Sequence, residues 1–479
     1  MTENDYIKLN TDQLQLITTE QAWHYRIIPK EKQNGSLHFY IDETMGGPNT
    51  RDELEILFGK PVTLENTSFE TIQKTLGKYY RRGEKSKESK QVNLSGNKTE
   101  DFLEKLISEA KELGSSDIHI EVYEEKCRVR IRIDGLLIER YSIGKYDYPA
   151  LINKIKIKAN LDIAEKRLPQ DGRIFYERDG HKFDIRVSVI PTLHGEKVVM
   201  RLLSNDATNI NIGELGFSEQ ELKFFLEGIK KPNGIILISG PTGSGKTTTL
   251  YATLKILNKE KTNILTVEDP IEYTLEGINQ VQVKESIGLS FASALRSFLR
   301  QDPDIIMLGE IRDGETANMA IRAALTGHLV LSTIHTNSAW GSISRLGDMG
   351  VPLYLLAGTL NTAVAQRLVR LLCVHCKEEF SFDEKNFPLN FSPPKKINNH
   401  WTAKGCEHCH YTGYKGRKAL YEIIPVGREL AEKIKNNQHD ISPWLKENKI
   451  KTLSENAFEL FEKGITSLDE VYPLLISSI

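Results

Sequence analysis

The sequence predicts an α/β fold whose largest domain is a mostly parallel sheet covered by helices. Short apolar runs alternate with helical stretches from residue 211 to residue 372, which is the pattern of consecutive βαβ units. One of these runs leads directly into a glycine-rich turn and then a helix. Upstream, two segments alternate strictly between apolar and polar residues, which indicates strands with one exposed face. The two kinds of strand belong to separate domains.

Length and composition describe a chain of several ordinary globular domains. The 479 residues predict two to four domains. Apolar residues make up 39% of the chain and charged residues 27%, as in typical globular proteins. The formal net charge is −2. A dedicated nucleic-acid binder usually carries a basic excess, so the charge disfavours that class of protein.

No apolar run is long enough to cross a membrane. The longest, such as 235–238 and 305–308, have the length of strands, whereas a membrane span needs about 20 residues. The N-terminal residues 1–5 are acidic and polar, unlike the start of a signal peptide. We therefore expect a cytoplasmic protein that is recruited to a membrane through partner proteins.

The chain begins with a small domain on a tether. Residues 1–80 mix helical and strand patterns and predict a small α/β domain. Residues 81–100 are nearly free of apolar side chains and rich in Lys, Ser, Asn and Gly, which is typical of a flexible linker. An α/β domain follows over residues 101–206. Its strands at 127–133 and 183–189 carry a basic or polar side chain at every second position, so that face contacts either solvent or a ligand.

The predicted parallel sheet occupies residues 211–372. Its strands are expected at 234–239, 263–267, 304–308 and 329–333. A cysteine-bearing insert follows over residues 373–417, and a helical region over 418–479 completes the chain.

The segment from Gly240 to Thr247 fits the P-loop template. It follows an apolar run and opens a helix, an order that turns backbone N–H groups and a helix N-terminus toward bound phosphates. In this arrangement Lys246 reaches the β- and γ-phosphates and Thr247 binds Mg²⁺. The predicted nucleotide-binding residues are Gly240, Pro241, Thr242, Gly243, Ser244, Gly245, Lys246, Thr247 and Thr248.

Polar side chains also stand at the ends of the other three strands. Glu310 follows the third strand, and Glu268 and Glu272 follow the second. Since parallel sheets bind ligands at the C-terminal ends of their strands, we expect Glu310 to polarise the attacking water or to support Mg²⁺, and Glu268 and Glu272 to help position the metal and the water. For Glu310 the alternative is an exposed acid at a strand end, and for the second group it is helix capping by Asp269. His335, after the fourth strand, is a structural histidine or a γ-phosphate sensor.

Together, these segments resemble the secretion and pilus assembly ATPase superfamily. That family combines a Walker A loop, an acidic box, a Walker B sequence ending in Gly-Glu, and a histidine box. The matching segments here are 240–247, 266–272, 304–310 and 327–337, joined by 116–121, 167–173, 186–188, 344–350 and 365–370. The similarity covers roughly residues 100–425.

The resemblance implies a hexameric ATPase built from four parts. These are an N-terminal docking domain, a PAS-like linking domain, a RecA-like core with a zinc knuckle, and a C-terminal helical region. ATP hydrolysis would power pilus or pseudopilus assembly and protein secretion through inner-membrane anchor and platform proteins. A DNA-uptake or conjugation motor of the same superfamily is the alternative, and a non-hydrolysing scaffold is a third hypothesis. Nucleic acid is not expected as a partner.

The resemblance also implies roles for arginines. Arg173 and Arg186, in the domain before the P-loop, match positions from which the family's arginines reach the nucleotide. Ordinary surface ion pairing is the alternative for each of them. A second matching set, on the motor side, would line the site or a subunit interface. It comprises Arg296, Arg300, Arg312 and Arg417.

Four of the five cysteines form two closely spaced pairs. Cys373 and Cys376 make one CxxC pair, and Cys406 and Cys409 make the other. Two such pairs can close all four positions around a structural, tetrahedral Zn²⁺. The alternative is that the two cysteine pairs are unrelated and bind no shared metal. The resemblance implies the same zinc site and favours an assembly or secretion motor over a retraction motor.

The N-terminal domain is short compared with that family. Residues 21–29 and 57–62 resemble the later half of the family's N-terminal domain. The further copy, which binds a cyclic dinucleotide in some pilus ATPases, has no match here, so we do not expect that regulation. The sequence does not separate type II secretion from type IV pilus assembly.

Overall fold

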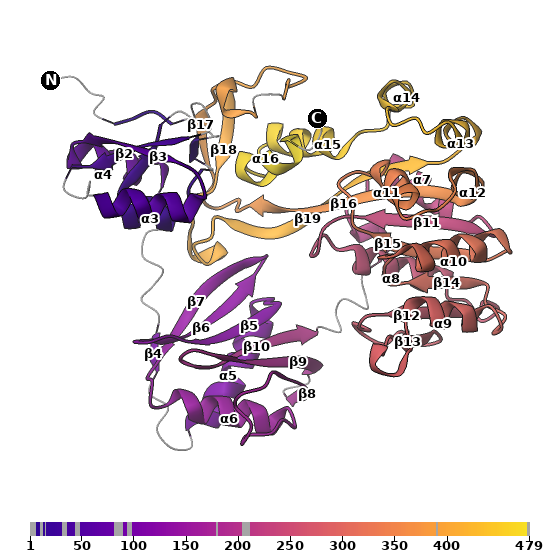
Figure 1. Cartoon of the computed structure of the whole chain (residues 1–479), viewed down its shortest axis with the longest axis horizontal. Helices are drawn as coiled ribbons and strands as arrows, with labels where there is room; N and C mark the ends of the chain where they lie inside the picture. Colours follow the sequence, from indigo (N-terminus) through magenta and orange to yellow (C-terminus); the bar gives the residue numbers. More distant parts are fainter. Residues whose placement is uncertain are drawn as a thin grey trace. The chain divides into compact units, whose positions relative to one another are not determined.

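The computed structural model describes residues 6–9, 13, 14, 16–30, 36–43, 48–80, 90–92, 98–178, 181–203, 211–388 and 391–476 (Figure 1). These residues fall into two compact units. The first unit takes in Met1–Glu88, Leu372–Gly413 and Ser467–Ile479, and the second takes in Ser89–Leu371 and Tyr414–Thr466. Both units contain helices and strands, which confirms the predicted α/β fold class.

A small three-stranded sheet opens the first unit. Strand β2 pairs antiparallel with β1 and parallel with β3. The elements are α2 (Thr19–Tyr25), β1 (Ile27–Pro29), β2 (Leu37–Asp42), α3 (Pro48–Phe58), β3 (Val62–Thr67) and α4 (Phe69–Tyr79). Strands and helices share one core, in which Ile27, Phe39 and Leu76 are completely buried. A shared core of this kind marks a small domain.

The cysteine-bearing segment of the first unit is organised by a two-stranded sheet. Strands β17 (Glu378–Ser381) and β18 (Asn399–Thr402) pair antiparallel, with Glu378 opposite Thr402. One CxxC pair directly precedes β17 and the other directly follows β18. Antiparallel pairing therefore brings the two cysteine pairs to the same end of the sheet. The remaining elements are η4 (Glu384–Asn386), η5 (Glu407–Cys409) and α16 (Leu468–Ile476).

The second unit begins with a seven-stranded sheet, which we call the linking domain (residues 90–203). The strand order is β4-β7-β6-β5-β10-β9-β8. Helices α5 and α6 share one apolar core with the sheet (Figure 1). The elements are β4 (Lys90–Val92), α5 (Lys98–Glu112), β5 (Asp117–Val122), β6 (Cys127–Ile133), β7 (Leu136–Ile143), α6 (Tyr148–Lys158), β8 (Gln170–Arg178), β9 (His181–Thr192) and β10 (Gly195–Leu203).

The second sheet of this unit belongs to the motor, which we define as residues 211–371 with strand β19. Its order is β13-β12-β14-β15-β11-β16-β19, and the first six strands pair in parallel. The strands are β11 (Gly234–Ser239), β12 (Ile264–Glu268), β13 (Asn279–Gln282), β14 (Ile305–Leu308), β15 (Leu329–Ile334), β16 (Leu360–Leu372) and β19 (Tyr414–Pro425).

Helices cover both faces of the motor sheet. Ile236 and Ile238 on one face of β11 share a core with residues of α7 and α8, and Ile235 and Leu237 on the other face are equally buried. Helices α10 and α12 contact β11 as well. The helices of the motor are η2 (Ile212–Glu214), α7 (Glu219–Ile229), α8 (Lys246–Leu257), η3 (Glu285–Ile287), α9 (Phe291–Phe298), α10 (Gly314–Leu325), α11 (Gly341–Asp348) and α12 (Leu353–Thr359). The helices that follow β19 in the second unit are α13 (Arg428–Lys435), α14 (Ser442–Glu447) and α15 (Leu453–Glu462).

Two predicted segment borders differ from the structure. Within the expected linker 81–100, Lys90–Val92 pair with β7, and α5 begins at Lys98. The other residues of this linker lie outside the described residues. The insert ends before the expected border at 417, because Tyr414–Pro425 form strand β19 beside β16. The region 418–479 is therefore not helical from its start. Gly413 and Gly416, just before this region, resemble a loop, but they lie at the start of a strand that is buried continuously from Ala419 to Ile424.

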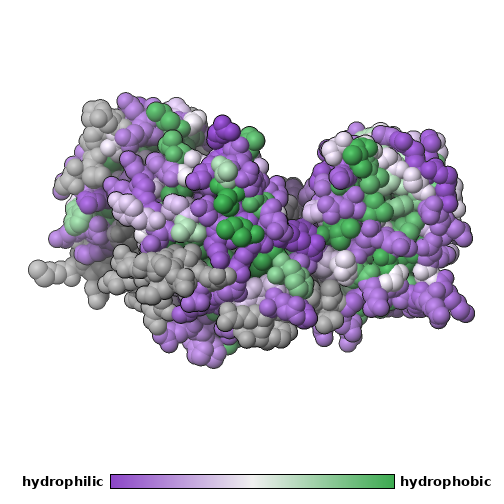
Figure 2. Space-filling model, turned by 90° about the horizontal axis from the view of Figure 1, so that it is seen from below, coloured by the Kyte–Doolittle hydropathy of each residue, from purple (hydrophilic) through white to green (hydrophobic). Residues whose placement is uncertain are grey.

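The surface is mixed in polarity. In the face shown in Figure 2, small apolar patches lie scattered among hydrophilic residues. Within the described residues, no helix is both long enough and apolar enough to span a membrane.

Candidate nucleotide site and metal centre

The P-loop lies between a buried strand and a helix, as the sequence predicts. Strand β11 is buried along its whole length, and α8 begins at Lys246. Between them Gly243 and Gly245 adopt φ angles of 81° and 86°, a left-handed conformation that glycine adopts without strain. A β-carbon on Gly245 would also lie 2.9 Å from Nε2 of Gln366. The turn therefore requires glycine where the motif has it.

The donors in the P-loop suit an anionic phosphate. The Ser244 hydroxyl is buried and has no hydrogen-bond partner among the described residues. The Lys246 ammonium donates to the carbonyls of Gly240 and Pro241, at 2.8 and 2.9 Å, so it folds back over the loop. Burial lowers the pKa of Lys246, which is a desolvation effect that a bound anion would offset. These groups, with the N-terminus of α8, fit the phosphates of a nucleotide.

Sheet topology brings the predicted catalytic residues to the same edge as the P-loop. Strands β14, β15 and β11 are parallel neighbours, so their C-terminal ends lie side by side. His335 Nε2 lies 3.3 Å from Glu310 Oε2. Arg312 binds the other oxygen of Glu310 at 2.5 Å and lies 3.4 Å from Asp269. Glu310, His335 and Arg312 thus form one cluster.

The cluster keeps the Glu310 carboxylate ionised. Its side chain is only 17% exposed. Burial raises the pKa of this carboxyl, but the hydrogen bonds and charges of Arg312 and His335 outweigh burial, and the net pKa is lowered. An ionised carboxylate at this position can accept a hydrogen bond from water.

The two arginines of the linking domain differ in their contacts. Arg186 forms an ion pair with Glu272 at 2.9 Å and donates to the carbonyl of Ile271, so it reaches the acidic box of the motor. Arg173 instead binds Asp184 on the neighbouring strand of its own sheet. The structure therefore brings Arg186 and Glu272 together and leaves Arg173 on the linking domain.

Glu268 is held inside the motor. The residue is 3% exposed, and its carboxylate accepts hydrogen bonds from the Tyr251 hydroxyl, from Thr266 at 2.7 Å and from Gln280 at 3.1 Å. All three donors are uncharged. In this arrangement the carboxylate connects β12 with α8, and a catalytic role for it stays a prediction.

The second set of arginines is spread over the second unit. Arg296 pairs with Glu315, Arg300 donates to the carbonyl of Arg296, and Arg417 lies 3.6 Å from Asp134 of the linking domain. Arg312 alone of this set lies in the Glu310 cluster.

Sequence reasoning missed two residues beside the P-loop. Gln366 accepts a hydrogen bond from Thr249 of α8 at 2.9 Å, and Arg367 donates to the carbonyl of Asn337 at 3.1 Å. Both stand on β16, which was not predicted as a strand. Their segment, 365–370, carries part of the family resemblance, and that was the available signal.

The four paired cysteines form a metal-binding geometry. Their sulfur atoms all lie within 4.8 Å of one another, and the Cys373–Cys406 and Cys376–Cys409 sulfur pairs are each 3.8 Å apart. Sulfurs at about 2.3 Å from a tetrahedral Zn²⁺ are separated by about 3.8 Å. Backbone N–H groups of Gly405 and Gly413 also point to these sulfurs. The donor set fits a closed, structural zinc site.

Comparisons with known proteins identify the family. Residues 94–473 match the family described as type II/IV secretion system protein. Type II secretion system protein E of Pseudomonas aeruginosa is 49% identical over 339 residues, which cover 71% of this chain and 68% of the relative. The type IV pilus assembly ATPase PilB of Myxococcus xanthus is 42% identical over 492 residues, covering 96% of this chain and 86% of the relative.

Solved structures share the fold. The pilus retraction motor PilT with bound ADP superposes with a TM-score of 0.53 at 26% identity, covering 77% of this chain and 95% of that chain. The ATPase DotB of Legionella pneumophila gives a TM-score of 0.61 at 22% identity, covering 81% of this chain and 99% of that chain. The chain therefore belongs to the type II/IV secretion system protein family and has the RecA-like P-loop fold of its ATPases.

Proposed function

We propose that this protein hydrolyses ATP to ADP and phosphate and uses the energy to assemble a pilus or a pseudopilus. The observation that carries this proposal is the ionised Glu310 beside His335, at the sheet edge that also holds the P-loop. A scaffold that only binds nucleotide has no need of a carboxylate and a histidine placed together at the P-loop edge of the sheet.

Phosphoryl transfer requires positioning and charge stabilisation more than covalent chemistry from the protein. The P-loop amides and Lys246 would bind the β- and γ-phosphates, and the Thr247 hydroxyl would hold a Mg²⁺ ion, which would offset phosphate charge. Glu310 accepts a hydrogen bond from the attacking water and orients it. His335 contacts Glu310 and senses the γ-phosphate. Arg186, now paired with Glu272, turns to the nucleotide as the linking domain closes.

The relatives guide the choice of machine. Proteins named for type II secretion match 71% and 77% of this chain, whereas the pilus assembly ATPase matches 96% and so includes the N-terminal domain. We therefore propose pilus assembly as the first machine to test. Deletion of the gene should remove surface pili; loss of enzyme secretion with normal pili would assign the protein to type II secretion.

Glu310→Gln tests the catalytic proposal. The amide keeps the size of the side chain and removes the charge, so ATP binding should persist while kcat falls roughly 10²- to 10⁴-fold. Lys246→Ala is the matched control, and it should lose nucleotide binding itself. Steady-state hydrolysis and binding of a fluorescent ATP analogue separate the two effects. Turnover at the wild-type rate in Glu310→Gln would reject this role for Glu310.

We also propose one structural Zn²⁺ per chain, bound by Cys373, Cys376, Cys406 and Cys409. Zinc binding at such sites is coupled to folding, so Cys376→Ser should lower the zinc content and the melting temperature of the first unit. Cys127→Ser, outside the site, should change neither. Elemental analysis of protein purified without chelator provides the measurement. A folded, zinc-free wild type would contradict the proposal.

We propose that the protein works as a hexamer at the cytoplasmic face of the inner membrane. The N-terminal domain, residues 1–80, would dock on the cytoplasmic part of a membrane anchor, and an inner-membrane platform protein would receive the movement. Deleting residues 1–80 should keep ATPase activity and abolish membrane recruitment. Membrane association of the truncated protein in the presence of the anchor would place the docking surface elsewhere.

A further inference from the structure

A buried carboxylate on the last strand of the motor takes no part in the mechanism described so far. Glu422, in β19, is 5% exposed. One of its oxygens accepts the backbone N–H of Ala339 at 2.8 Å, and the other accepts the backbone N–H of Leu453 at 3.2 Å. A buried charge is costly unless it is hydrogen-bonded. Here each oxygen holds a different segment of the chain.

The first of these segments leads back to the nucleotide site. Residues 335–339 connect His335, at the end of β15, to Ala339. Along this segment, the Ser338 carbonyl accepts a hydrogen bond from the Ser239 hydroxyl at 3.2 Å, directly before the P-loop. The Asn337 carbonyl accepts one from Arg367. The segment is therefore fixed to the P-loop side through its carbonyls and to Glu422 through an N–H.

The second segment is the start of α15. Leu453 is the first residue of that helix, and its N–H is one of those that no helical carbonyl can accept. A carboxylate at a helix N-terminus is also favoured by the helix dipole. A further bond joins the same regions, because the Trp340 indole donates to the Gln438 carbonyl beyond α13 at 3.0 Å. The C-terminal helices are thus attached to the chain that follows His335.

The donors around Glu422 offset only part of its desolvation. Burial raises the pKa of the Glu422 carboxyl, and the N–H groups of Ala339 and Leu453 together with the Arg367 charge lower it by less, so the net pKa is raised. Arg367 itself lies close to the P-loop, since a β-carbon on Gly240 would be 3.2 Å from its NH1 atom. Charge and hydrogen bonds connect the P-loop, segment 335–339 and α15 in one continuous network.

We propose that Glu422 is a positioning residue for ATP hydrolysis, because its carboxylate holds segment 335–339, and through it His335, in place against Glu310. The same carboxylate makes that placement depend on how α15 docks on β19. This inference rests on the proposed ATPase function and extends it to a residue with no contact to the nucleotide.

Glu422→Gln is the primary test. An amide cannot accept two N–H groups with both of its polar atoms, so one of the two segments is released. Small misplacements of catalytic groups cost up to about a hundredfold in rate. We expect kcat to fall about tenfold or more, while the KM for ATP changes less than about threefold because the P-loop is untouched. Glu422→Asp is the second variant, since it keeps the charge and is too short to reach both N–H groups.

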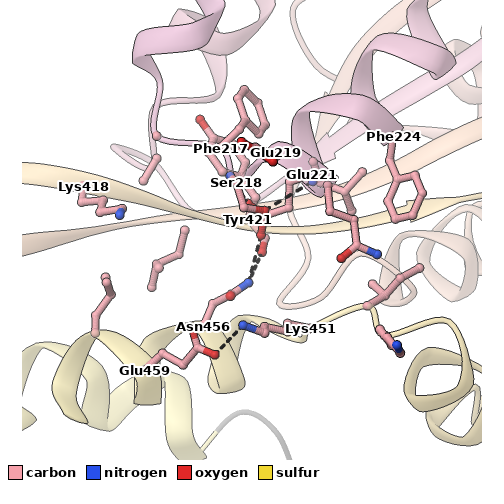
Figure 3. A pocket seen from close by; sticks show the side chains of 18 of the residues that line it. Phe217, Ser218, Glu219, Glu221, Phe224, Lys418, Tyr421, Lys451, Asn456 and Glu459 are labelled. Atoms are coloured by element: carbon pink, nitrogen blue, oxygen red, sulfur yellow. Dashed lines mark hydrogen bonds and ion pairs between the residues drawn. The ribbon is translucent and has the colours of Figure 1, made fainter. Parts of the chain in front are cut away.

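Asn456→Ala is the matched control for a merely structural effect. The Asn456 amide donates to the Tyr421 carbonyl at 2.8 Å and to Glu221 at 3.1 Å, across the cavity that lies between β19, α7 and α15 (Figure 3). This variant loosens α15 without touching segment 335–339. It should lower the melting temperature as Glu422→Gln does, yet keep kcat within about twofold of wild type.

A double-mutant cycle with His335→Ala decides whether Glu422 acts through His335. Once His335 is absent, Glu422→Gln should lower kcat by less than about twofold. Hydrogen exchange in residues 335–341 should be faster in Glu422→Gln and unchanged in Asn456→Ala.

Four results would overturn the proposal. They are wild-type kcat in both Glu422 variants, additive effects in the cycle, an equal loss of kcat in Asn456→Ala, and failure of both Glu422 variants to fold. If Glu310→Gln still turned over at the wild-type rate, the proposed catalytic function would fail instead, and the exchange measurement would still test the placement of the segment.

Discussion

The motor and the linking domain are both α/β, but their sheets differ in what covers the second face. Strands β11 and β15 of the motor are buried at every position, since helices pack on both faces. Strand β6 of the linking domain is buried at every second position, and its other face carries arginines. In the motor, polar groups therefore collect at the strand ends, where the proposed nucleotide site lies. In the linking domain, charges run along the strands themselves.

The two domains also differ in how each one stabilises a buried carboxylate. Glu121 of the linking domain is 2% exposed and is bound by the charged side chains of Arg128 and Arg130 at 2.8 and 2.7 Å. Burial raises the pKa of Glu121, but these arginines outweigh burial and bring the pKa to about 2. Glu268 of the motor is equally buried and has only uncharged donors. Cations stabilise one carboxylate, and hydroxyl and amide groups stabilise the other.

The largest effect on turnover is expected from a change at the contact between the linking domain and the motor. Arg186→Ala removes the ion pair with Glu272 and the charge that the linking domain would supply to the γ-phosphate. Arginines that act in this way contribute about 10³- to 10⁵-fold in rate. We expect kcat to fall at least about a hundredfold, while ATP binding to the P-loop persists.

Two arginines of the same sheet serve as comparisons for Arg186→Ala. Arg173→Ala should lower turnover less, because Arg173 binds Asp184 in this structure. Arg201→Ala removes a surface pair with Asp117 and should have little effect. Steady-state kinetics of the three variants shows which of them loses the most turnover. An equal loss in all three would mean that the linking domain acts through its fold alone.

A smaller effect, on stability, is expected at Glu121. Glu121→Gln leaves two partly buried arginines without their carboxylate, which should cost about 3 kcal/mol near neutral pH. The native pKa of about 2 lies below the ordinary value of 4.5, so the wild-type contribution is present above pH 4.5. It is lost as the pH falls toward 2, because protons then bind the unfolded chain preferentially.

Calorimetry at several acidic pH values tests the Glu121 prediction. The linking-domain transition of wild type should move to lower temperature as the pH falls below about 4.5, and that of Glu121→Gln should move less. Glu139→Gln, on the more exposed side of the same network, should keep most of the wild-type slope. Parallel pH profiles for wild type and Glu121→Gln would argue against a charge-stabilised Glu121.

The smallest effect is expected at Glu268. Glu268→Gln keeps a polar group among uncharged donors, and the Tyr251 hydroxyl can rotate to accept from the new amide. We expect a loss of about 1 kcal/mol in the free energy of unfolding. Thermal unfolding of the motor, with Tyr251→Phe as the comparison, measures it. A loss of turnover with intact stability would instead restore the catalytic role that the sequence suggests for Glu268.

Local sequence determined the parts of this protein that depend on neighbouring residues. The P-loop, the buried strands around it and the two CxxC pairs follow from backbone conformation, apolar runs and ligand spacing within short segments. The proximity of Glu310 and His335 could be expected as well, because the C-terminal ends of parallel strands lie at one edge of the sheet.

Contacts between distant residues were decided only by the tertiary structure. Strand β19 was not predicted because Gly413 and Gly416, at its start, resemble a loop, and its pairing partner β16 lies in another part of the chain. Arg173 and Arg186 look alike in sequence, but only Arg186 contacts the motor. Glu422 is one acid among many in the sequence, and it connects two distant segments because the backbone N–H groups of Ala339 and Leu453 donate to its two oxygens. Sequence periodicity records which side chains are buried, whereas partners far along the chain depend on how the elements pack.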